Sequence, residues 1–444
     1  MTERPGTATP PGHISRWWQL VAAVVAMMAI ANLQYAWTLF TIPLTKSLGA
    51  SLAAVQVAFA AFILVETWLV PFEGWLVDRF GPRLIIMSGA VFVALGWIGS
   101  GLTHTLSGLY VFYTLGGIGA GAIYGACIGH ALKWFPDHRG LCAGITAGAY
   151  GIGTALTVAP IESMIRASGY AHTFVVWGFI QGIVVLVMGV FIVSPPPGWV
   201  PAGWSDKQAV RRSNVNVSSV DMTPWQMMGH GSFWAIYFMM TLMAFSGLVI
   251  TAQVNPIAKF YHVDQVIVAF GMSALVLAIQ IERILNGITR PFWGWVSDHI
   301  GRENTMFIAF GLQSITIVAL LQLIHHPVWF IVLSGLAFFS WGEIFSLFPA
   351  ITADLFGRKY ATTNYGIVYT AKGLAAIFSG PVAAMAAAAT GSWVGVFWAM
   401  VVCSAVDAVL ALALLKPLAR RTVARGIAMS SSQMPSMVVR GATD

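Results

Sequence analysis

Three basic residues stand inside long apolar segments: Arg283, Arg290 and Lys372. Arg290 precedes Asp298 by eight residues and Lys372 follows Thr363 by nine, which places each about 12–14 Å into a helical span. An ionisable side chain at that depth costs at least ~2.5–3.5 kcal/mol on insertion scales, so it is a functional candidate. Two cations at similar depth repel unless an anion neutralises them. The pattern predicts a site for a small carboxylate with two negative charges, held by the Arg fork and the Lys point charge.

Acidic residues inside the apolar segments leave other interpretations open. Among them are Glu66, Glu282, Glu343 and Asp407. Each candidate cation could be paired with one of these carboxylates, although we expect Arg290 and Lys372 to face a substrate. For Arg283, two turns before Arg290, a structural or gating pair with Glu66 or Glu282 is favoured. Glu343 could balance a charge or carry a proton, and the sequence does not separate these two roles.

Amphipathic side chains within other apolar segments could complete the site. Tyr365, Tyr369 and Lys372 follow i, i+4, i+7 spacing and share one helix face. Rings with a polar tip could wall a narrow cavity and donate hydrogen bonds to a carboxylate. The candidates on other segments are Tyr35, Tyr124, Tyr150 and Trp341, together with Gln34 and Gln56.

The elements that must position these residues are membrane-spanning helices. Of the 444 residues, 58% are hydrophobic and 9% are charged, whereas soluble domains have about a quarter charged residues. This composition excludes a soluble enzyme. No nucleophile, metal or phosphate-loop motif is present, and the three cysteines lack metal-ligand spacing, so we expect no enzyme activity, cofactor or metal. The apolar segments predict an all-α membrane protein with twelve transmembrane helices, at residues 17–43, 53–77, 84–103, 107–132, 141–165, 171–193, 232–258, 266–296, 304–325, 328–353, 363–390 and 393–415.

The two halves of the chain repeat one another. The sequence VPFEGWLVD from Val70 matches RPFWGWVSD from Arg290, at an offset of 220 residues. Such internal repeats are typical of transporters with the substrate site at the repeat interface. Gly144-Ile145 likewise matches Gly366-Ile367, at an offset of 222 residues. By these two offsets Arg290 aligns with Val70 and Lys372 with Tyr150, so neither cation is required by the architecture alone. We predict five segments: a cytoplasmic N-terminal segment 1–16, an N-terminal six-helix bundle 17–193, a cytoplasmic linker 194–231, a C-terminal six-helix bundle 232–416 and a cytoplasmic tail 417–444.

The distribution of basic residues predicts the orientation in the membrane. If both termini are cytoplasmic, 17 of the 23 Lys and Arg residues lie in cytoplasmic segments. Only Lys46, Arg166 and Lys259 then lie outside, as the positive-inside rule requires. The net charge of +7 therefore concerns topology rather than nucleic acid. We expect a multi-pass protein of the inner cell membrane that works as a monomer within the lipid bilayer.

Two motifs carry a resemblance to known transporters. GWLVDRFGPR from Gly74 and its copy GWVSDHIGR from Gly294 resemble the loop signature of the major facilitator superfamily. Within that superfamily the chain is similar to the oxalate/formate antiporters, through NGITRP from Asn286, WGE from Trp341 and YTAKG from Tyr369. The resemblance implies two six-helix bundles around a central cavity that opens to each side in turn.

The narrower resemblance also implies a substrate and a site. It implies uptake of oxalate in exchange for formate, with the family's Arg and Lys on Arg290 and Lys372 and its aromatic cage on Tyr35, Tyr124, Tyr150 and Trp341, with Tyr369, Gln34 and Gln56 nearby. Phe345 replaces a hydroxyl-bearing ring of that cage. The alternative is a proton-coupled importer of another small mono- or dicarboxylate, with Glu66 or Glu343 carrying the proton.

Overall fold

The computed structural model describes residues 15–135, 139–196, 221–357 and 360–432. Most of the predicted N-terminal segment, the central part of the linker and the end of the tail lie outside these residues. In the N-terminal half the helices are α1 (Arg16–Tyr35), α2 (Trp37–Leu48), α3 (Leu52–Trp68), α4 (Val70–Phe80), α5 (Pro82–Leu102), α6 (Leu106–Trp134), α7 (Arg139–Ile152), the 3₁₀ helix η1 (Gly153–Leu156) and α8 (Val158–Phe191).

The C-terminal half is also built mainly of helices. Its elements are α10 (Pro224–Met228), α11 (Gly231–Phe260), β1 (Ile267–Ala269), β2 (Met272–Ser273), α12 (Ala274–Ile300), α13 (Arg302–Leu323), α14 (Pro327–Trp341), α15 (Ile344–Phe356), α16 (Ala361–Ile377), η3 (Phe378–Val382), α17 (Ala383–Thr390), α18 (Val394–Leu410), η4 (Ala411–Leu415) and α19 (Lys416–Ser432). The short strands pair antiparallel in a hairpin.

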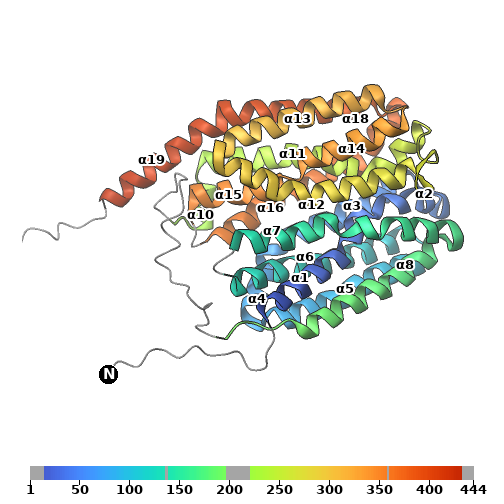
Figure 1. The fold of residues 1–444 in the computed structure, drawn as a ribbon, viewed down its shortest axis with the longest axis horizontal. Coiled ribbons are helices and arrows are strands. Elements are labelled where there is room, and N and C mark those ends of the chain that lie inside the picture. Colours follow the sequence, from blue (N-terminus) through green and yellow to red (C-terminus); the bar gives the residue numbers. More distant parts are fainter. Residues whose placement is uncertain (1–14, 136–138, 197–220, 358–359, 433–444) are drawn as a thin grey trace, which may run out of the picture.

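The helices form two groups that lie side by side along the long axis (Figure 1). Within the first group α5 packs against α6 and α8, and within the second α12 packs against α14 and α13 against α18. The contacts between the groups are most extensive where α3 meets α16, α7 meets α12, and α2 meets α11. Residues on these pairs therefore lie between the two bundles.

The helices are consistent with the twelve predicted spans. Among the described residues, nine helical segments are long and apolar enough to cross a membrane, and the pair α3 and α4, bent by 42°, makes a tenth. One of the nine, Gly144–Phe191, covers two predicted spans and contains the non-helical Gly169. Helix α12 has 27 residues but carries Glu282, Arg283 and Arg290, which lowers its apolarity.

The start of the predicted eighth span is corrected by the structure. Helix α12 begins at Ala274 rather than at residue 266. Residues 267–273 form the hairpin instead, and its turn residues Phe270 and Gly271 both have positive φ. The Ser273 side chain then caps the helix by accepting a hydrogen bond from the Val276 N–H.

The internal repeat is visible in the backbone. Gly81 ends α4 with φ 82° and ψ 157°, and Gly301 ends α12 with φ 89° and ψ 154°. This left-handed conformation suits glycine, and the two residues are 220 positions apart, as in the sequence repeat. In the second copy Arg302 contacts Asp298 at 2.7 Å and Asp354 at 3.1 Å, which ties the loop to α15.

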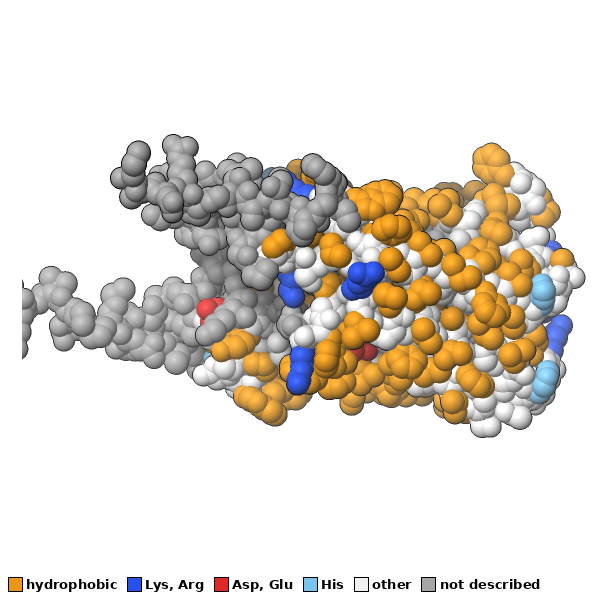
Figure 2. All heavy atoms as spheres, turned by 90° about the horizontal axis from the view of Figure 1, so that it is seen from below, with side chains coloured by type: hydrophobic (Ala, Val, Ile, Leu, Met, Phe, Trp, Pro, Cys, Tyr) orange, Lys and Arg blue, Asp and Glu red, His pale blue; other side chains and the backbone are white. Residues whose placement is uncertain are grey.

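The outer surface is apolar, as a lipid-facing surface must be. Large side chains on α5 and α8 are exposed, among them Leu95, Phe179 and Ile183. Figure 2 shows hydrophobic side chains covering much of the described surface between the end that carries His, Lys and Arg side chains and the Lys and Arg side chains nearer the other end. Such a continuous apolar surface is expected in contact with acyl chains.

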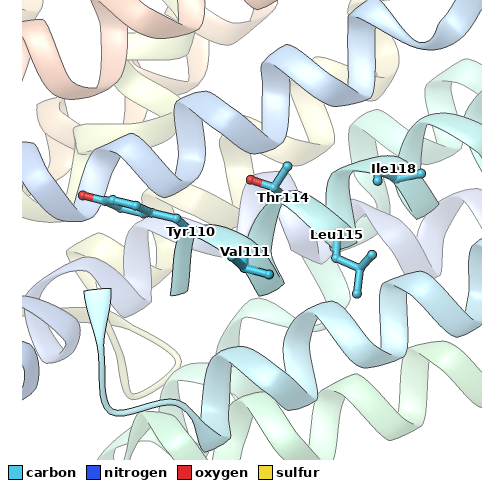
Figure 3. Close-up of a pocket in the computed structure, with 5 residues that line it drawn as sticks. All are labelled: Tyr110, Val111, Thr114, Leu115 and Ile118. Atoms are coloured by element: carbon cyan, nitrogen blue, oxygen red, sulfur yellow. The ribbon is translucent and has the colours of Figure 1, made fainter. Parts of the chain in front are cut away.

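A pocket on α6 belongs to this outer surface. Its lining comprises Tyr110, Val111, Thr114, Leu115 and Ile118 (Figure 3). All five residues come from one helix and none carries a charge. This pocket therefore lacks the chemistry of an anion site.

Close packing at Gly247 supports the position of Trp341. A Cβ atom added at Gly247 would lie 2.1 Å from two atoms of the Trp341 indole ring. We predict that Gly247→Ala lowers the free energy of unfolding by roughly 1–3 kcal/mol, because the ring cannot move without disturbing its neighbours. Thermal unfolding of the purified protein in detergent measures this change. Gly311→Ala is the control, because no atom lies within 4 Å of the added Cβ there, and equal stability of both variants would contradict the prediction.

Candidate functional site

Lys372 is paired with an acidic residue, which is the alternative that the sequence left open for this side chain. Its Nζ atom lies 3.0 Å from Oε2 of Glu66, and both side chains are about 1% exposed. Lys372 also donates to Gln34 Oε1 at 3.0 Å and to the Tyr369 hydroxyl at 3.1 Å. A buried ion pair requires such extra hydrogen bonds to offset desolvation. Because Glu66 is on α3 and Lys372 is on α16, the pair joins the two bundles.

Arg290 has no such acidic partner in the described ranges. Among the described residues no carboxylate lies within 4 Å of its guanidinium group, although the side chain is only 3% exposed. One nitrogen donates to the backbone carbonyl of Ala147 on α7, and the guanidinium lies 4.5 Å from the ring centroid of Phe345. Arg290 therefore keeps an uncompensated buried charge at the contact between α12 and α7.

Phe345 lies beside both cations. The Lys372 ammonium is 5.8 Å from its ring centroid, while Trp341 packs edge-on at 5.3 Å and Tyr369 at 6.3 Å. The ring faces offer a weak cation–π attraction without neutralising either charge. Phe345 thus brings the two cations of the C-terminal bundle to one aromatic wall.

The predicted tyrosines of the N-terminal bundle form the opposite wall. The Tyr150 ring lies 5.4 Å from the rings of both Tyr35 and Tyr124, and Tyr124 stacks on Tyr369 at 6.1 Å. The Tyr150 hydroxyl donates to Oε1 of Glu66 at 3.0 Å and lies 3.1 Å from Gln34 Oε1. Helix breaks help to position this wall, since Tyr35 is the last residue of α1.

Arg283 forms the structural ion pair that the sequence favours. Its guanidinium contacts Glu282 at 2.8 Å and lies between the rings of Tyr35 and Phe338, at 4.2 and 4.1 Å. Asn286, one turn later, donates to the Tyr35 hydroxyl at 3.1 Å. These contacts hold Tyr35 in place.

Gln56 and Trp341 have their polar atoms engaged elsewhere. Gln56 accepts a hydrogen bond from Trp37 at 2.9 Å and donates to the Ala252 carbonyl and to Gln253, at 2.8 and 2.9 Å. Trp341 donates to the Met243 carbonyl at 3.0 Å. Gln56 therefore joins α3 to α11 near the end where α2 and α3 meet, and Trp341 contributes an apolar ring.

A second contact closes the same end. The Asn255 backbone N–H donates to the Thr38 hydroxyl and its side chain donates to the Thr38 carbonyl, both at 2.9 Å. Together with the Gln56 contacts, this joins the two bundles at the end opposite to α4, α15 and α19 (Figure 1). By the predicted orientation this is the outer end of the molecule.

Three side chains of the site are outside the predicted set of substrate-binding residues. Glu66 pairs with Lys372, Phe345 lies beside both cations, and Asn286 holds Tyr35. Glu66 could have been singled out from the sequence, because it is the single charged residue of α3. Which cation it would meet is not readable from spacing, since Lys372 is 306 residues away.

The site also holds polar atoms without protein partners. In the part of the chain that the structure describes, buried Arg290 Nε, Gln34 Nε2 and Asn286 Oδ1 accept or donate no hydrogen bond. Two of the three are donors, and they belong to opposite bundles. Donors beside an uncompensated cation are the groups that a carboxylate needs.

Comparison with known proteins identifies the fold. The family model of the Major Facilitator Superfamily matches residues 22–285 and 284–430. The chain belongs to the major facilitator superfamily. It is therefore a multi-pass membrane transporter, and its family is one of transporters rather than enzymes.

Three relatives cover most of the chain. The oxalate:formate antiporter of Oxalobacter formigenes is 35% identical over 381 residues, which are 85% of this chain and 86% of the relative. The transporter YhjX of Escherichia coli K12, described as uncharacterized, is 26% identical over 82% of this chain and 86% of its own length. The probable sulfoacetate transporter SauU of Cupriavidus necator is 23% identical over 78% of this chain and 82% of its own length.

Proposed function

We propose that this superfamily transporter exchanges small carboxylates, taking up oxalate and releasing formate by alternating access. Arg290 and Lys372 bind the carboxylate groups, and Tyr35, Tyr124, Tyr150, Tyr369 and Gln34 line the site. Trp341 packs behind Phe345, and Gln56 acts through the contact between the bundles. The observation that carries the proposal is Arg290, a buried cation at the bundle interface without a carboxylate partner among the described residues, in a chain that resembles an oxalate:formate antiporter.

The uncompensated charge favours exchange over net transport. A buried unpaired cation is costly, so the substrate-free carrier resists closing around Arg290. A bound carboxylate supplies the missing negative charge, so the loaded carrier crosses more readily. Both directions of transport then require an anion in the site. We place the protein in the inner cell membrane with both termini cytoplasmic, working as a monomer.

A second candidate is a proton-coupled importer of another small mono- or dicarboxylate. The contact that favours it is the ion pair of Lys372 with Glu66, because a membrane carboxyl group beside the site can bind a proton. Such an importer would accumulate substrate without any anion inside the vesicle.

Counterflow in proteoliposomes separates the two candidates. We predict that labelled oxalate enters vesicles loaded with oxalate or formate, and that vesicles without an internal anion take up little. The rise in uptake measures the requirement for exchange. Uptake that is independent of the internal anion would reject exchange and favour the importer. A panel of small carboxylates added outside defines the substrate range by competition.

A further inference from the structure

Arg283 lies between the proposed substrate site and the outer end of the molecule. Helix α12 begins at Ala274, at the end that the predicted orientation places outside. Arg283 precedes Arg290 by seven residues, which places it about 10 Å nearer that end. The contacts of Gln56 and Asn255 with the opposite bundle lie farther out. A carboxylate that enters between the bundles from outside therefore meets Arg283 before Arg290.

Aromatic rings from both bundles cover Arg283. Its guanidinium lies 4.1 Å from the ring centroid of Phe338 on α14, which belongs to the same bundle. It lies 4.2 Å from the ring centroid of Tyr35 on α1, which belongs to the opposite bundle. The Tyr35 ring is in turn 5.4 Å from the Tyr150 ring, and Tyr35 also interacts electrostatically with Arg290. The stack of Tyr35 on Arg283 therefore separates the outer contacts from the substrate site.

The stack lies at a break in the first span. Helix α1 ends at Tyr35, and a separate helix, α2, follows after Ala36. At the outer end α2 is held against α11 through Asn255. Opening of the outer end moves α2 away from α11, and the break beside Tyr35 is where the span can bend. Because Tyr35 and Arg283 belong to different bundles, the same movement takes the ring off the guanidinium.

Two nitrogens of Arg283 are available for an anion. Nη2 donates to Glu282 Oε2 at 2.8 Å, whereas Nε and Nη1 have no hydrogen-bond partner among the described residues. The side chain is only 1% exposed, so water does not satisfy these donors while the outer end is closed. A cation–π contact is weaker than a charge-assisted hydrogen bond to a carboxylate. A carboxylate can therefore take the place of the Tyr35 ring once the outer end opens.

Glu282 makes this first site a weak one. Its carboxylate balances the charge of Arg283, and in the described chain it is the one carboxylate within 4 Å of that guanidinium. Arg290 has no such partner among the described residues, so an anion is attracted more strongly there. A weaker site followed by a stronger one lets the anion move inward rather than stay at the first.

We propose that Arg283 is an entry site for carboxylates behind an outer gate: its stack with Tyr35 closes the path from outside, and in the opened carrier its guanidinium binds the incoming carboxylate before Arg290 does. The inference rests on the proposed carboxylate exchange and adds a further binding residue to it. An anion released to the outside follows the same route in reverse. An anion that enters from the cytoplasmic side reaches Arg290 without passing Arg283.

Spin labels at the outer end test the gate without any substrate. Lys46→Cys on α2 and Lys259→Cys on α11 provide two exposed labelling positions, in a protein whose native cysteines are replaced by alanine. Distances between the labels from double electron–electron resonance give the ratio of open to closed carriers. Tyr35→Leu should raise this ratio about tenfold, as expected for the loss of a desolvated cation–π contact.

The arginine is removed together with its carboxylate, so that no unpaired charge stays buried. The neutral pair, Glu282→Gln with Arg283→Gln, should also raise the open-to-closed ratio about tenfold. Tyr35→Leu added to the neutral pair should raise it no further, because both changes remove the same contact. Glu282→Gln alone keeps the stack and should leave the ratio near that of the wild type.

Two ring variants make the result specific. Phe338→Leu removes the other ring from the guanidinium, at nearly the same distance but within one bundle, so it should leave the open-to-closed ratio unchanged. Tyr35→Phe keeps the ring and loses only the hydroxyl group that accepts from Asn286, so it should raise the ratio less than Tyr35→Leu.

Oxalate self-exchange in proteoliposomes tests the entry site. In the neutral pair, uptake from external oxalate well below half-saturation should fall about tenfold, the equivalent of one charge-assisted hydrogen bond. Uptake at saturating external oxalate, and the half-saturation measured from inside, should stay near the wild-type values. A gate without an entry site would have the opposite effect on dilute oxalate, because more carriers would then be open to the outside.

Three results would overturn the proposal: a neutral pair as closed as the wild type, a Phe338→Leu protein as open as Tyr35→Leu, or a neutral pair that takes up dilute oxalate at the wild-type rate. Loss of uptake by the neutral pair at saturating oxalate as well would contradict a role limited to entry. Absence of oxalate self-exchange in the wild-type protein would instead reject the proposed function, while the spin labels still report on the gate.

Discussion

The Arg290→Ala variant is expected to lose oxalate exchange by about 100-fold or more. Arg290 supplies the uncompensated positive charge of the site, and its Nε atom has no protein partner in the described chain. Charge-assisted hydrogen bonds contribute about 1.5–3 kcal/mol each, and the upper value corresponds to about 100-fold. Initial rates of labelled oxalate uptake into formate-loaded proteoliposomes measure the loss.

Two further substitutions make this result specific. Arg290→Lys retains the charge but not the planar fork, so it should recover part of the rate. Arg166→Ala removes an exposed arginine that pairs with Glu162 four residues earlier on α8, and it should transport as wild type. Exchange at the wild-type rate in Arg290→Ala would show that the substrate binds elsewhere.

The Lys372→Ala variant is expected to lose both transport and stability. Removal of the ammonium group leaves the Glu66 carboxylate buried without its cation, and breaking a buried ion pair in this way costs roughly 3–5 kcal/mol. It also removes one of the two cations proposed to bind substrate. Thermal unfolding in detergent measures the stability, and counterflow measures the transport.

A double variant separates the two effects of Lys372. Glu66→Gln added to Lys372→Ala removes the stranded carboxylate, so it should restore most of the stability while transport stays absent. Recovery of transport in the double variant would mean that Lys372 serves only to neutralise Glu66. A Lys372→Ala protein as stable as wild type would contradict the buried ion pair.

Much of the architecture can be read from the sequence because lipid imposes one strong rule. Backbone groups in a bilayer must be hydrogen-bonded within the segment, so long apolar stretches become helices. The match to the family model also agrees with the repeat around Gly81 and Gly301. The hairpin before α12 could not be predicted from this rule, because Phe270 and Gly271 form a turn just before the span begins. Length and apolarity alone placed that start eight residues too early.

The site could be predicted in its residue types but not in its pairings. Arg290 and Lys372 stand out because charge is rare in an apolar span, and that contrast is a property of the sequence. The partner of each cation depends on how α12 and α16 are rotated and on which helix of the other bundle they meet. Spans that are apolar nearly all round carry little periodic signal about rotation, so Glu66 could not be assigned to Lys372.

The sequence by itself determined that this chain is a bundle of membrane helices, built as a repeat, with two cations deep inside. The length of an apolar segment and the number of its charged residues are local quantities, which can be read from the sequence of each span separately. Only the tertiary structure decided that one cation is neutralised by Glu66 while Arg290 is not. Contacts across the bundle interface join residues 125 to 338 positions apart, and their geometry follows from how whole helices pack.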